Sequence, residues 1–356
     1  MRETHRLPSY SFGGHEVYDK VPEFTAPYGN KVAIIGGVTA LSVAMPILRP
    51  VLDKEGIEIL AEIPGGGECS YERAREIASM DEVKQADFMF AVGGGKVMDL
   101  VKVVAIELED KPFFTFPTIA ATCAASSEAA AVYTPDHVFF GMAFVKHPPL
   151  HNFINAQILV EAPERYLWAG MGDTIAKRYE TEFSSRNREK TYNSQLGLMV
   201  APMCAEPILK YAVQAIADNK AKKRSLAFDE MVMSVVFTTA IVSGSLREDY
   251  NSNVAHATCY GCATNPETEH KHLHGELVSY GVLVLLLVDQ QMDEFNRWYP
   301  VYKEIGWPRK LEHLHLTKDY IPNIIDKALS VNDVVVSPYE ITRDMMEQAM
   351  LKLESM

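Results

Sequence analysis

Apolar and polar positions along the first 130 residues predict buried strands that alternate with amphipathic helices. Short apolar runs rich in β-branched or aromatic residues predict strands that run into turns at 30–37, 57–68, 86–96 and 111–122. Helical periodicity predicts intervening helices at 38–56, 70–85 and 97–109, the second of them capped by Ser70. Such alternation is typical of a mostly parallel sheet with helices on both faces.

The pattern changes at about Ala162, where long helical periods replace the β-branched runs. Helical spacing of apolar residues covers 163–183, 193–219 and 229–245. A chain of 356 residues also exceeds the size at which one hydrophobic core usually keeps growing. We therefore expect an α/β domain at 1–161 and an all-α domain at 162–356.

The acidic net charge of the chain argues against polyanionic partners. The formal net charge is −13 and the sequence pI is about 5.4, so nucleic acid and anionic membrane surfaces are repelled at long range. We expect neither as a partner, although a local basic pocket for a small anion is compatible with this average.

Targeting and redox features predict a cytoplasmic protein with reduced thiols. The longest uninterrupted apolar run, 281–288, is far shorter than the roughly 20 residues that span a bilayer, so we expect no membrane span. The N-terminus lacks the apolar core of a signal peptide. The five cysteines are odd in number and lie in unrelated contexts, which argues against a disulfide framework.

Residues 256–276 combine four histidines with a C-x-x-C pair. A structural zinc knuckle would draw its ligands from the following set: Cys259, Cys262, His270, His272 and His274. Alternatively, an active-site metal uses only some of these residues and takes another ligand from elsewhere in the chain. In a third interpretation the histidines are merely solvated on a loop.

The glycine-rich segment at 93–96, GGGK, lies between a predicted strand and a predicted helix. Glycines there allow the backbone to approach phosphate oxygens, and the helix N-terminus supplies N–H donors. The segment is neither a Walker loop nor the G-x-G-x-x-G fingerprint. It therefore indicates either a phosphate site or only a tight turn.

Five motifs in order give a more specific signal. GGGKVMDLVK, PTIAATCAASSEAAAVYT, GMGDTIAKRYE, AHATCYG and HGELVSYG follow one another between 93 and 281. Together they resemble the iron-containing alcohol dehydrogenase superfamily, and most closely its glycerol dehydrogenase branch, from about Lys31 to Gly281. The resemblance implies a dinucleotide-binding α/β domain and a helical domain, an architecture shared with dehydroquinate synthase. It also implies a divalent metal between the domains and hydride transfer between an alcohol carbon and nicotinamide.

The resemblance carries specific residues over to this chain. The metal ligands of that branch correspond to Asp173, His256 and His274. Its nucleotide contacts correspond to Gly94, Gly95 and Lys96 with Asp99 just behind for the phosphates, and to Thr118, Ser127 and Tyr133 for ribose and nicotinamide. Two histidines, one carboxylate and an open position also suit a catalytic zinc on chemical grounds. This assignment disfavours the knuckle. His270 and His272 are then expected to be solvated, with a hydrogen bond to a metal-ligating residue as the alternative for either.

Two departures from the branch concern substrate and cofactor. Cys123 stands where the branch has an aspartate that helps to hold a polyol, which places glycerol in doubt. A small residue packed under the cofactor is the alternative role for Cys123. Gly37 stands where the branch has an acidic residue that would repel the 2′-phosphate of NADP. We therefore expect NAD(P)(H), with NADPH allowed and even preferred.

Three further residues bear on the metal site. Lys177 lies one helical turn after Asp173, where other alcohol dehydrogenases of the superfamily have another metal-ligating histidine. Its presence favours three protein ligands, zinc over iron, and a cation for a substrate carboxylate; a surface ion pair is the alternative. Cys259 replaces a histidine able to relay protons, and Glu276 either orients His274 or starts a helix.

The sequence thus predicts a metal-dependent NAD(P)-linked oxidoreductase for a small alcohol or 2-hydroxy acid and its 2-oxo acid, similar to bacterial hydroxycarboxylate dehydrogenases. Asp173, His256, His274 and Lys177 are the expected catalytic residues, and Cys123 and Lys177 the expected substrate residues. Alternatives are a glycerol or polyol dehydrogenase, a dehydroquinate synthase-like lyase, which Asp173 disfavours, and a degenerate nucleotide-binding scaffold. The superfamily also implies a homo-oligomer.

Overall fold

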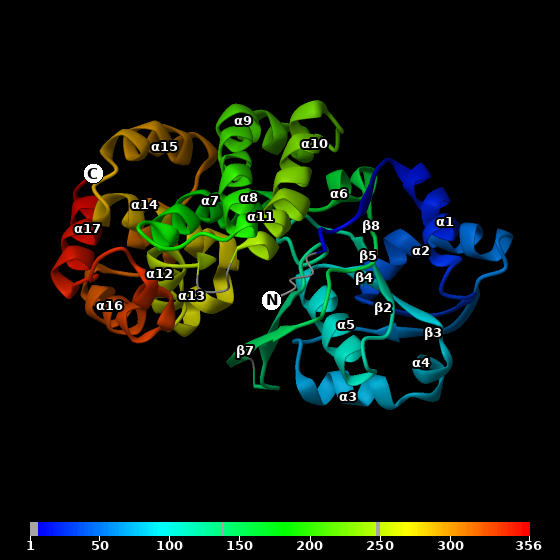
Figure 1. The fold of residues 1–356 in the computed structure, drawn as a ribbon. Coiled ribbons are helices and arrows are strands. Elements are labelled where there is room, and N and C mark those ends of the chain that lie inside the picture. Colours follow the sequence, from blue (N-terminus) through cyan, green and yellow to red (C-terminus); the bar gives the residue numbers. More distant parts are fainter. Residues whose placement is uncertain (1–5, 137, 247–249) are drawn as a thin grey trace. The chain divides into compact units, whose positions relative to one another are not determined.

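The computed structural model describes residues 6–136, 138–246 and 250–356 of the chain (Figure 1). Backbone contacts divide the protein into two compact units. Unit 1 comprises Met1–Pro163 and Ala221–Arg224, and unit 2 comprises Glu164–Lys220 and Ser225–Met356. The segment Ala221–Arg224 therefore returns from the helical half to the α/β unit.

Unit 1 contains a six-stranded sheet in the order β1-β8-β5-β4-β2-β3, whose strand pairs are all parallel. Its strands are β1 (Tyr10–Gly13), β2 (Lys31–Gly36), β3 (Glu58–Pro64), β4 (Phe88–Gly93), β5 (Phe113–Pro117) and β8 (Asn152–Asn155). Its helices are α1 (Val21–Thr25), α2 (Val38–Lys54), α3 (Tyr71–Ser79), α4 (Asp81–Gln85), α5 (Gly95–Glu107) and α6 (Ala156–Glu161). The predicted α/β class is confirmed.

Burial explains why the central strands read as continuous apolar runs. Every residue of β4 is buried, as expected of a strand covered on both faces. Phe88 and Phe90 of β4 pack with Leu48 and Leu52 of α2 in one apolar core, and α5 also packs against β4.

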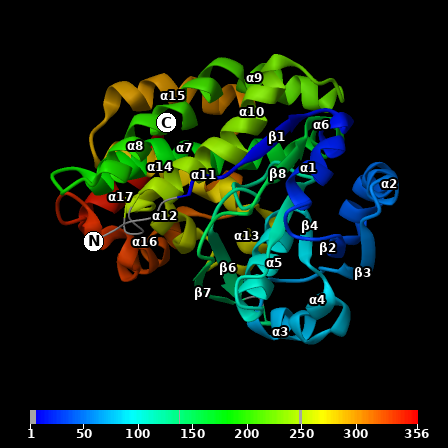
Figure 2. The same cartoon turned by 45° about the vertical axis from the view of Figure 1, so that its right-hand side comes forward.

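Local signals explain the remaining differences from the predicted elements. The Ser70 side chain accepts a hydrogen bond from the Arg73 backbone N–H, so the predicted cap is confirmed. The predicted helix 70–85 breaks at Met80, whose ψ of 135° is extended, into α3 and α4. Four strands were not predicted: the short neighbours β1 and β8 (Figure 2) and the antiparallel hairpin of β6 (Ala129–Tyr133) and β7 (Phe139–Phe144).

Unit 2 is helical in its described residues. Its α-helices are α7 (Glu164–Ser185), α8 (Tyr192–Val200), α9 (Glu206–Lys220), α10 (Leu226–Met233), α11 (Thr239–Ser245), α12 (Val254–Cys262), α13 (Pro266–Lys271), α14 (His274–Val288), α15 (Met292–Ile305), α16 (Ile321–Ser330) and α17 (Arg343–Ser355). Every residue of α14 after His274 is buried, and α7, α12, α15 and α17 pack around this helix (Figure 1).

Helix α14 packs so closely on α7 and α12 that their backbones are in contact. A Cβ on Gly275 would lie 1.9 Å from the Ala169 carbonyl oxygen of α7, and a Cβ on Gly172 would lie 2.3 Å from the Gly275 carbonyl oxygen. On the other side of α14, a Cβ on Gly281 would lie 2.2 Å from the Ala255 carbonyl oxygen of α12. Only glycine permits these helix crossings.

Two helical stretches, Tyr192–Lys220 and Leu226–Ser245, are long and apolar enough to cross a bilayer by length and composition. The expectation that no segment reaches this length was wrong, because it counted only uninterrupted apolar runs. The second stretch is 61% buried, as core helices are, whereas the first is only 33% buried. Two such helices are weak evidence for membrane insertion.

We predict that Gly275→Ala destabilises unit 2 by about 3 kcal/mol, because the new methyl group meets backbone atoms that cannot rotate away. Urea unfolding followed by circular dichroism measures the change. Gly66→Ala is the control, since its Cβ would have no neighbour within 4 Å. Equal stability of the Gly275→Ala protein and wild type would contradict the close helix crossing.

Candidate metal centre and nucleotide turns

Three helices of unit 2 bring Asp173, His256 and His274 together. Asp173 follows Gly172 on α7, His256 follows Ala255 on α12, and His274 is the first residue of α14. One ligand atom from each of the three lies within 4.8 Å of the others. Among the described residues, no other group of three or more His, Cys, Asp or Glu side chains converges in this way.

The distances within this triad fit a metal ion. His256 Nε2 lies 3.4 Å and His274 Nε2 lies 3.9 Å from the same Asp173 Oδ1. Two ligands of a tetrahedral zinc at about 2.0–2.1 Å are about 3.3 Å apart, so a small closure brings all three into range. Asp173 and His256 are largely buried, whereas the His274 side chain is 48% exposed, which leaves one side of the triad open.

Glu180 is a site residue that the sequence analysis missed. It is fully buried, and its Oε2 accepts a hydrogen bond from His256 Nδ1 at 2.5 Å. Its Oε1 accepts from the backbone N–H groups of Asn253 and His256 at 2.7 and 2.9 Å. The spacing could have revealed it, because Glu180 lies seven residues, two helical turns, after Asp173 on the face that also carries Lys177.

Cys259 lies behind the other imidazole. Its Sγ is 3.5 Å from His274 Nδ1 and 3.9 Å from the His274 carbonyl oxygen. The thiol therefore faces the opposite side of the ring from Nε2. This position disfavours Cys259 as a ligand in a knuckle with His274, and Cys262 is buried one turn further along α12.

The buried charges shift the pKa values of the triad. Burial alone would lower the pKa of His256, but the Glu180 charge and hydrogen bonds with Asp173 and Glu180 raise it to about 10. Burial would raise the pKa of Asp173, but the His256 hydrogen bond and nearby cationic groups hold it well below its usual range. Burial would raise the pKa of Glu180, but the charge and hydrogen bonds of His256 together with the Lys177 charge lower it. Desolvation lowers the pKa of His274, and the Asp173 charge offsets this only in part.

Lys177 is half-buried beside the triad. Its Nζ donates to the Asn251 carbonyl oxygen at 2.7 Å, and its charge helps to lower the pKa values of Asp173 and Glu180. Among the described residues it forms no ion pair with a carboxylate within 4 Å, so two of its three N–H donors are available.

His272 is not the solvated loop histidine that was predicted. Its Nδ1 bonds Glu276 Oε2 at 2.7 Å, its Nε2 bonds His315 Nδ1 at 2.8 Å, and its side chain is 9% exposed. Glu276 binds Arg165 and the Leu273 backbone N–H in addition to His272, and so stabilises the start of α14. His270 is exposed at the end of α13.

The predicted nucleotide residues of unit 1 follow the carboxyl ends of its central strands. Gly37 comes after β2, Gly94 and Gly95 after β4, and Thr118 after β5. The chain turns from β2 outward to β3 and then back to β4 on the other side of β2. Gly37 and Gly94 therefore flank the topological switch point, where parallel sheets of this type bind ligands.

The glycine turn is also tightly packed. A Cβ on Gly94 would lie 2.5 Å from Ile119 Cδ1, so any larger residue there would require the Ile119 side chain to move. Lys96 is exposed, and its Nζ bonds the Glu68 carboxylate. A phosphate bound to Lys96 would compete with Glu68 for this cation.

Asp99 and Ser127 both bind the buried side chain of Lys102, a residue that the sequence analysis did not identify. Lys102 is fully buried, and its Nζ lies 3.1 Å from Asp99 Oδ1, 3.2 Å from Ser127 Oγ and 2.5 Å from the Ala129 carbonyl oxygen. Asp99 Oδ2 also accepts from the Ala131 N–H. The pair thus links α5 to the start of β6, and its only sequence signal is the i,i+3 spacing.

The remaining predicted residues lie nearby in unit 1. Thr118 is buried, and its N–H bonds the Gly93 carbonyl oxygen at 3.0 Å. The Cys123 carbonyl oxygen accepts from the N–H groups of Ser126 and Ser127 at 2.9 and 3.1 Å. Tyr133 ends β6, and its N–H bonds the Cys69 carbonyl oxygen at 2.7 Å.

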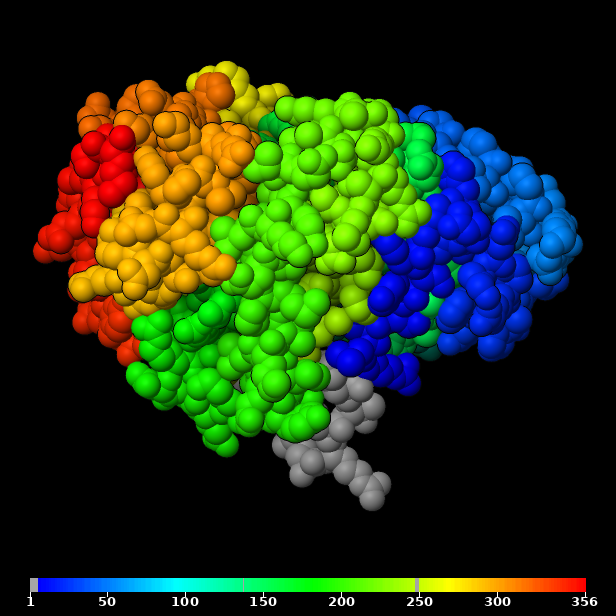
Figure 3. Space-filling model, turned by 90° about the horizontal axis from the view of Figure 1, so that it is seen from above, coloured from blue at the N-terminus to red at the C-terminus, as the bar shows by residue number. Residues whose placement is uncertain are grey.

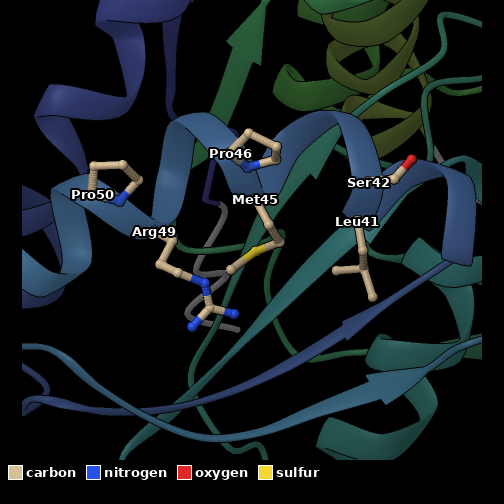
Figure 4. Close-up of a pocket in the computed structure, with 6 residues that line it drawn as sticks. All are labelled: Leu41, Ser42, Met45, Pro46, Arg49 and Pro50. Carbon is tan, nitrogen blue, oxygen red and sulfur yellow. The ribbon is translucent and has the colours of Figure 1, made fainter.

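Two surface cavities lie apart from the predicted site residues. One, of about 370 Å³, runs along α2, where the side chains of Leu41, Met45 and Arg49 project to one side of the helix (Figure 4). Its cation, Arg49, is already paired with Glu62. The other, of about 460 Å³, lies at the end of α7, where Arg178 and Arg186 are both paired with carboxylates. Neither contains a predicted ligand.

The sequence is similar to that of known dehydrogenases. Residues 8–152 match the family described as iron-containing alcohol dehydrogenase. A glycerol dehydrogenase of Thermotoga maritima is 32% identical over 278 residues, 76% of this chain and 74% of that protein. Hydroxycarboxylate dehydrogenase A of Escherichia coli is 29% identical over 344 residues, 93% of this chain and 91% of that protein.

The fold has solved counterparts as well. A probable glycerol dehydrogenase from Sinorhizobium meliloti 1021 superimposes with a TM-score of 0.85, at 24% identity, over 99% of this chain and 98% of that one. The fold, the order of motifs and the Thermotoga maritima relative lead to one conclusion. The chain belongs to the iron-containing alcohol dehydrogenase family and is an NAD-linked oxidoreductase that acts on the CH–OH group of a small molecule with a divalent metal.

Proposed function

We propose that the protein interconverts a small 2-hydroxy acid and its 2-oxo acid, with Asp173, His256 and His274 as the metal ligands. The observation that carries the proposal is the convergence of these three groups with the Lys177 cation one helical turn away. The metal, when bound, supplies a Lewis acid for the substrate oxygen. Because Lys177 takes the place of a fourth protein ligand, we propose zinc rather than iron.

Lys177 gives the site its preference for acids. An ammonium group with two free donors binds a carboxylate by charge-assisted hydrogen bonds, which are stronger than bonds to neutral oxygens. The Asn251 carbonyl bond holds Nζ in place at 2.7 Å, so less side-chain freedom is lost when a carboxylate binds.

A polyol substrate is the second candidate. It is favoured by the glycerol dehydrogenases among the similar proteins, whereas the hydroxycarboxylate dehydrogenase favours the acid. Cys123 distinguishes them chemically, because a thiol is a poor partner for the hydroxyl groups that a carboxylate would hold.

Substrate preference is measured by oxidation of NADH or NADPH with zinc-loaded protein and a short 2-oxo acid, dihydroxyacetone or a simple aldehyde. We expect the highest kcat/KM with the 2-oxo acid, and loss of activity with chelator. The Lys177→Met variant should raise KM for the 2-oxo acid about tenfold or more, the size of one lost charge-assisted bond, with a much smaller effect on dihydroxyacetone.

His256→Ala is the control for metal dependence and should lose bound metal and turnover together. Equal effects of Lys177→Met on the acid and on dihydroxyacetone would remove the carboxylate role. A wild-type preference for dihydroxyacetone would establish the polyol candidate instead.

We also propose that NADPH is accepted, because the turn after β2 has no acidic side chain. Gly37 is the N-cap of α2, with φ −65° and ψ 146°, and the nearest neighbour of an added Cβ is Ala40 Cβ at 3.8 Å. The turn therefore leaves space where a 2′-phosphate would otherwise meet a carboxylate.

The matched test compares Gly37→Asp with Gly37→Asn. Both side chains fit the backbone and cap α2, and only aspartate is charged. We expect Gly37→Asp to shift the ratio of kcat/KM values toward NADH about tenfold, and Gly37→Asn to change it little. If the two variants behave alike, the turn does not face the adenosine ribose.

Self-association is proposed from an exposed apolar stripe on α8. Tyr192 is 82% exposed and Met199 is 80% exposed, and their spacing of seven residues places them on one face of the helix. Helices α8 to α10 lie at the surface in the green part of Figure 3. Met203, one turn after Met199, is 54% exposed as well. Several exposed apolar side chains on one surface are typical of protein interfaces.

Light scattering during size-exclusion chromatography should give a mass of two or more chains of 39.8 kDa. Met199→Glu should lower that mass, because it places a charge in the stripe. Val335→Glu changes a 72% exposed residue elsewhere in unit 2 and is the control. A monomeric wild-type protein would contradict the proposal.

A further inference from the structure

We propose that Glu180 and Cys259 are positioning residues that hold both ligand imidazoles in the tautomer protonated at Nδ1. Each Nε2 faces Asp173 and offers its lone pair on that side once a metal takes the place of its proton. The inference rests on the proposed metal site, and it assigns roles to two side chains that do not touch the metal or the substrate.

Glu180 determines the His256 tautomer through the bonds on its other oxygen. Two backbone N–H groups, from Asn253 and His256, occupy Oε1. Oε2 is left as a pure acceptor 2.5 Å from His256 Nδ1. A deprotonated carboxylate can only accept, so the imidazole must present N–H at Nδ1. Nε2 is then the nitrogen that gives up its proton when a metal binds.

Cys259 favours the same tautomer of His274, although its thiol is a weaker hydrogen-bond acceptor than the Glu180 carboxylate. Its Sγ lies within hydrogen-bond range of the His274 carbonyl oxygen, which can only accept, so the S–H proton is directed there. The sulfur lone pairs then face Nδ1 at 3.5 Å and accept a hydrogen bond from its N–H. The cysteine that replaces a relay histidine therefore has a structural role behind the ligand.

The two histidines are consequently held unequally. His256 is buried against a charged, doubly anchored acceptor, whereas His274 is half-exposed against a neutral thiol. Charge-assisted hydrogen bonds are roughly twice as strong as neutral ones. Loss of the Glu180 acceptor should therefore cost more metal affinity than loss of the Cys259 acceptor.

Glu180→Gln is the decisive substitution because it keeps the shape of the side chain. Its single carbonyl oxygen can satisfy either the two backbone N–H groups or His256 Nδ1. The two backbone donors favour the first arrangement, which points the amide N–H₂ group at Nδ1 and places the proton on Nε2. We expect the affinity for Co²⁺ to fall about 10- to 100-fold, the usual cost of losing a partner behind a histidine ligand.

The measurement is titration of metal-free protein with Co²⁺, with the visible spectrum reporting geometry and chelator competition reporting Kd. Glu182→Gln on the same helix is the matched control, because that carboxylate is exposed and pairs with Arg178. For the thiol, Cys259→Ala should weaken binding several-fold and Cys259→Ser less. Cys262→Ala controls for the cavity left by a buried cysteine on the same helix.

Each outcome is distinguishable. Urea unfolding of the metal-free variants separates a loss of affinity from a loss of fold. Wild-type protein that binds no Co²⁺ would overturn the proposed metal site itself. Wild type that binds, together with an unchanged Kd and spectrum in Glu180→Gln, would overturn the positioning role of Glu180. Equal Kd values for Cys259→Ala, Cys262→Ala and wild type would overturn the role of Cys259.

Discussion

The convergence of Asp173, His256 and His274 depends on contact between the backbones of three helices. Asp173 and His274 are each adjacent to a glycine, Gly172 or Gly275, at the point where α7 and α14 touch. An alanine at either glycine would force the helices apart, and helix separation moves the ligands with it. The geometry of the site is therefore set by residues that have no side chain and take no part in the chemistry.

Buried charge is the second constraint, because carboxylates are costly to desolvate without partners. Unit 2 places Asp173 and Glu180 on either side of His256, with Lys177 nearby, so the anions share cationic and N–H partners. Unit 1 solves the same problem with one ion pair, Asp99 and Lys102. Burial still raises the pKa of Asp99, an effect that Lys102 offsets only in part. In unit 2 the buried charges of α7 bind His256 of α12, and in unit 1 those of α5 bind the backbone of β6.

Periodicity was sufficient to predict the core of the sheet and its turns, because β2, β4 and β5 are buried on both faces and read as apolar runs. It failed for β6, whose Ala-rich sequence has no strand signal of its own and is stabilised by pairing with β7 and by Lys102.

The proposed metal ligands could be predicted only through the resemblance, because no local pattern links Asp173 to histidines some 80 to 100 positions later. The positioning partners are harder still. Glu180 was within reach of helical spacing, whereas the contact of Cys259 with His274 arises from the packing of α12 on α14. His272 was misjudged because its partner His315 comes from a distant turn in the chain.

The unequal support of the two histidines suggests an order of metal uptake. Asp173 and His256 already lie 3.4 Å apart, fixed by Glu180 and by buried helices. His274 is more open and stands 3.9 Å from the same oxygen, so its movement is the one that completes the site. In the proposed metal site, a fixed pair of ligands and a movable third ligand would let a metal enter from solvent without unfolding α14. Burial raises the pKa of the Cys259 thiol well above its usual value, so a movement of His274 leaves no buried thiolate behind it.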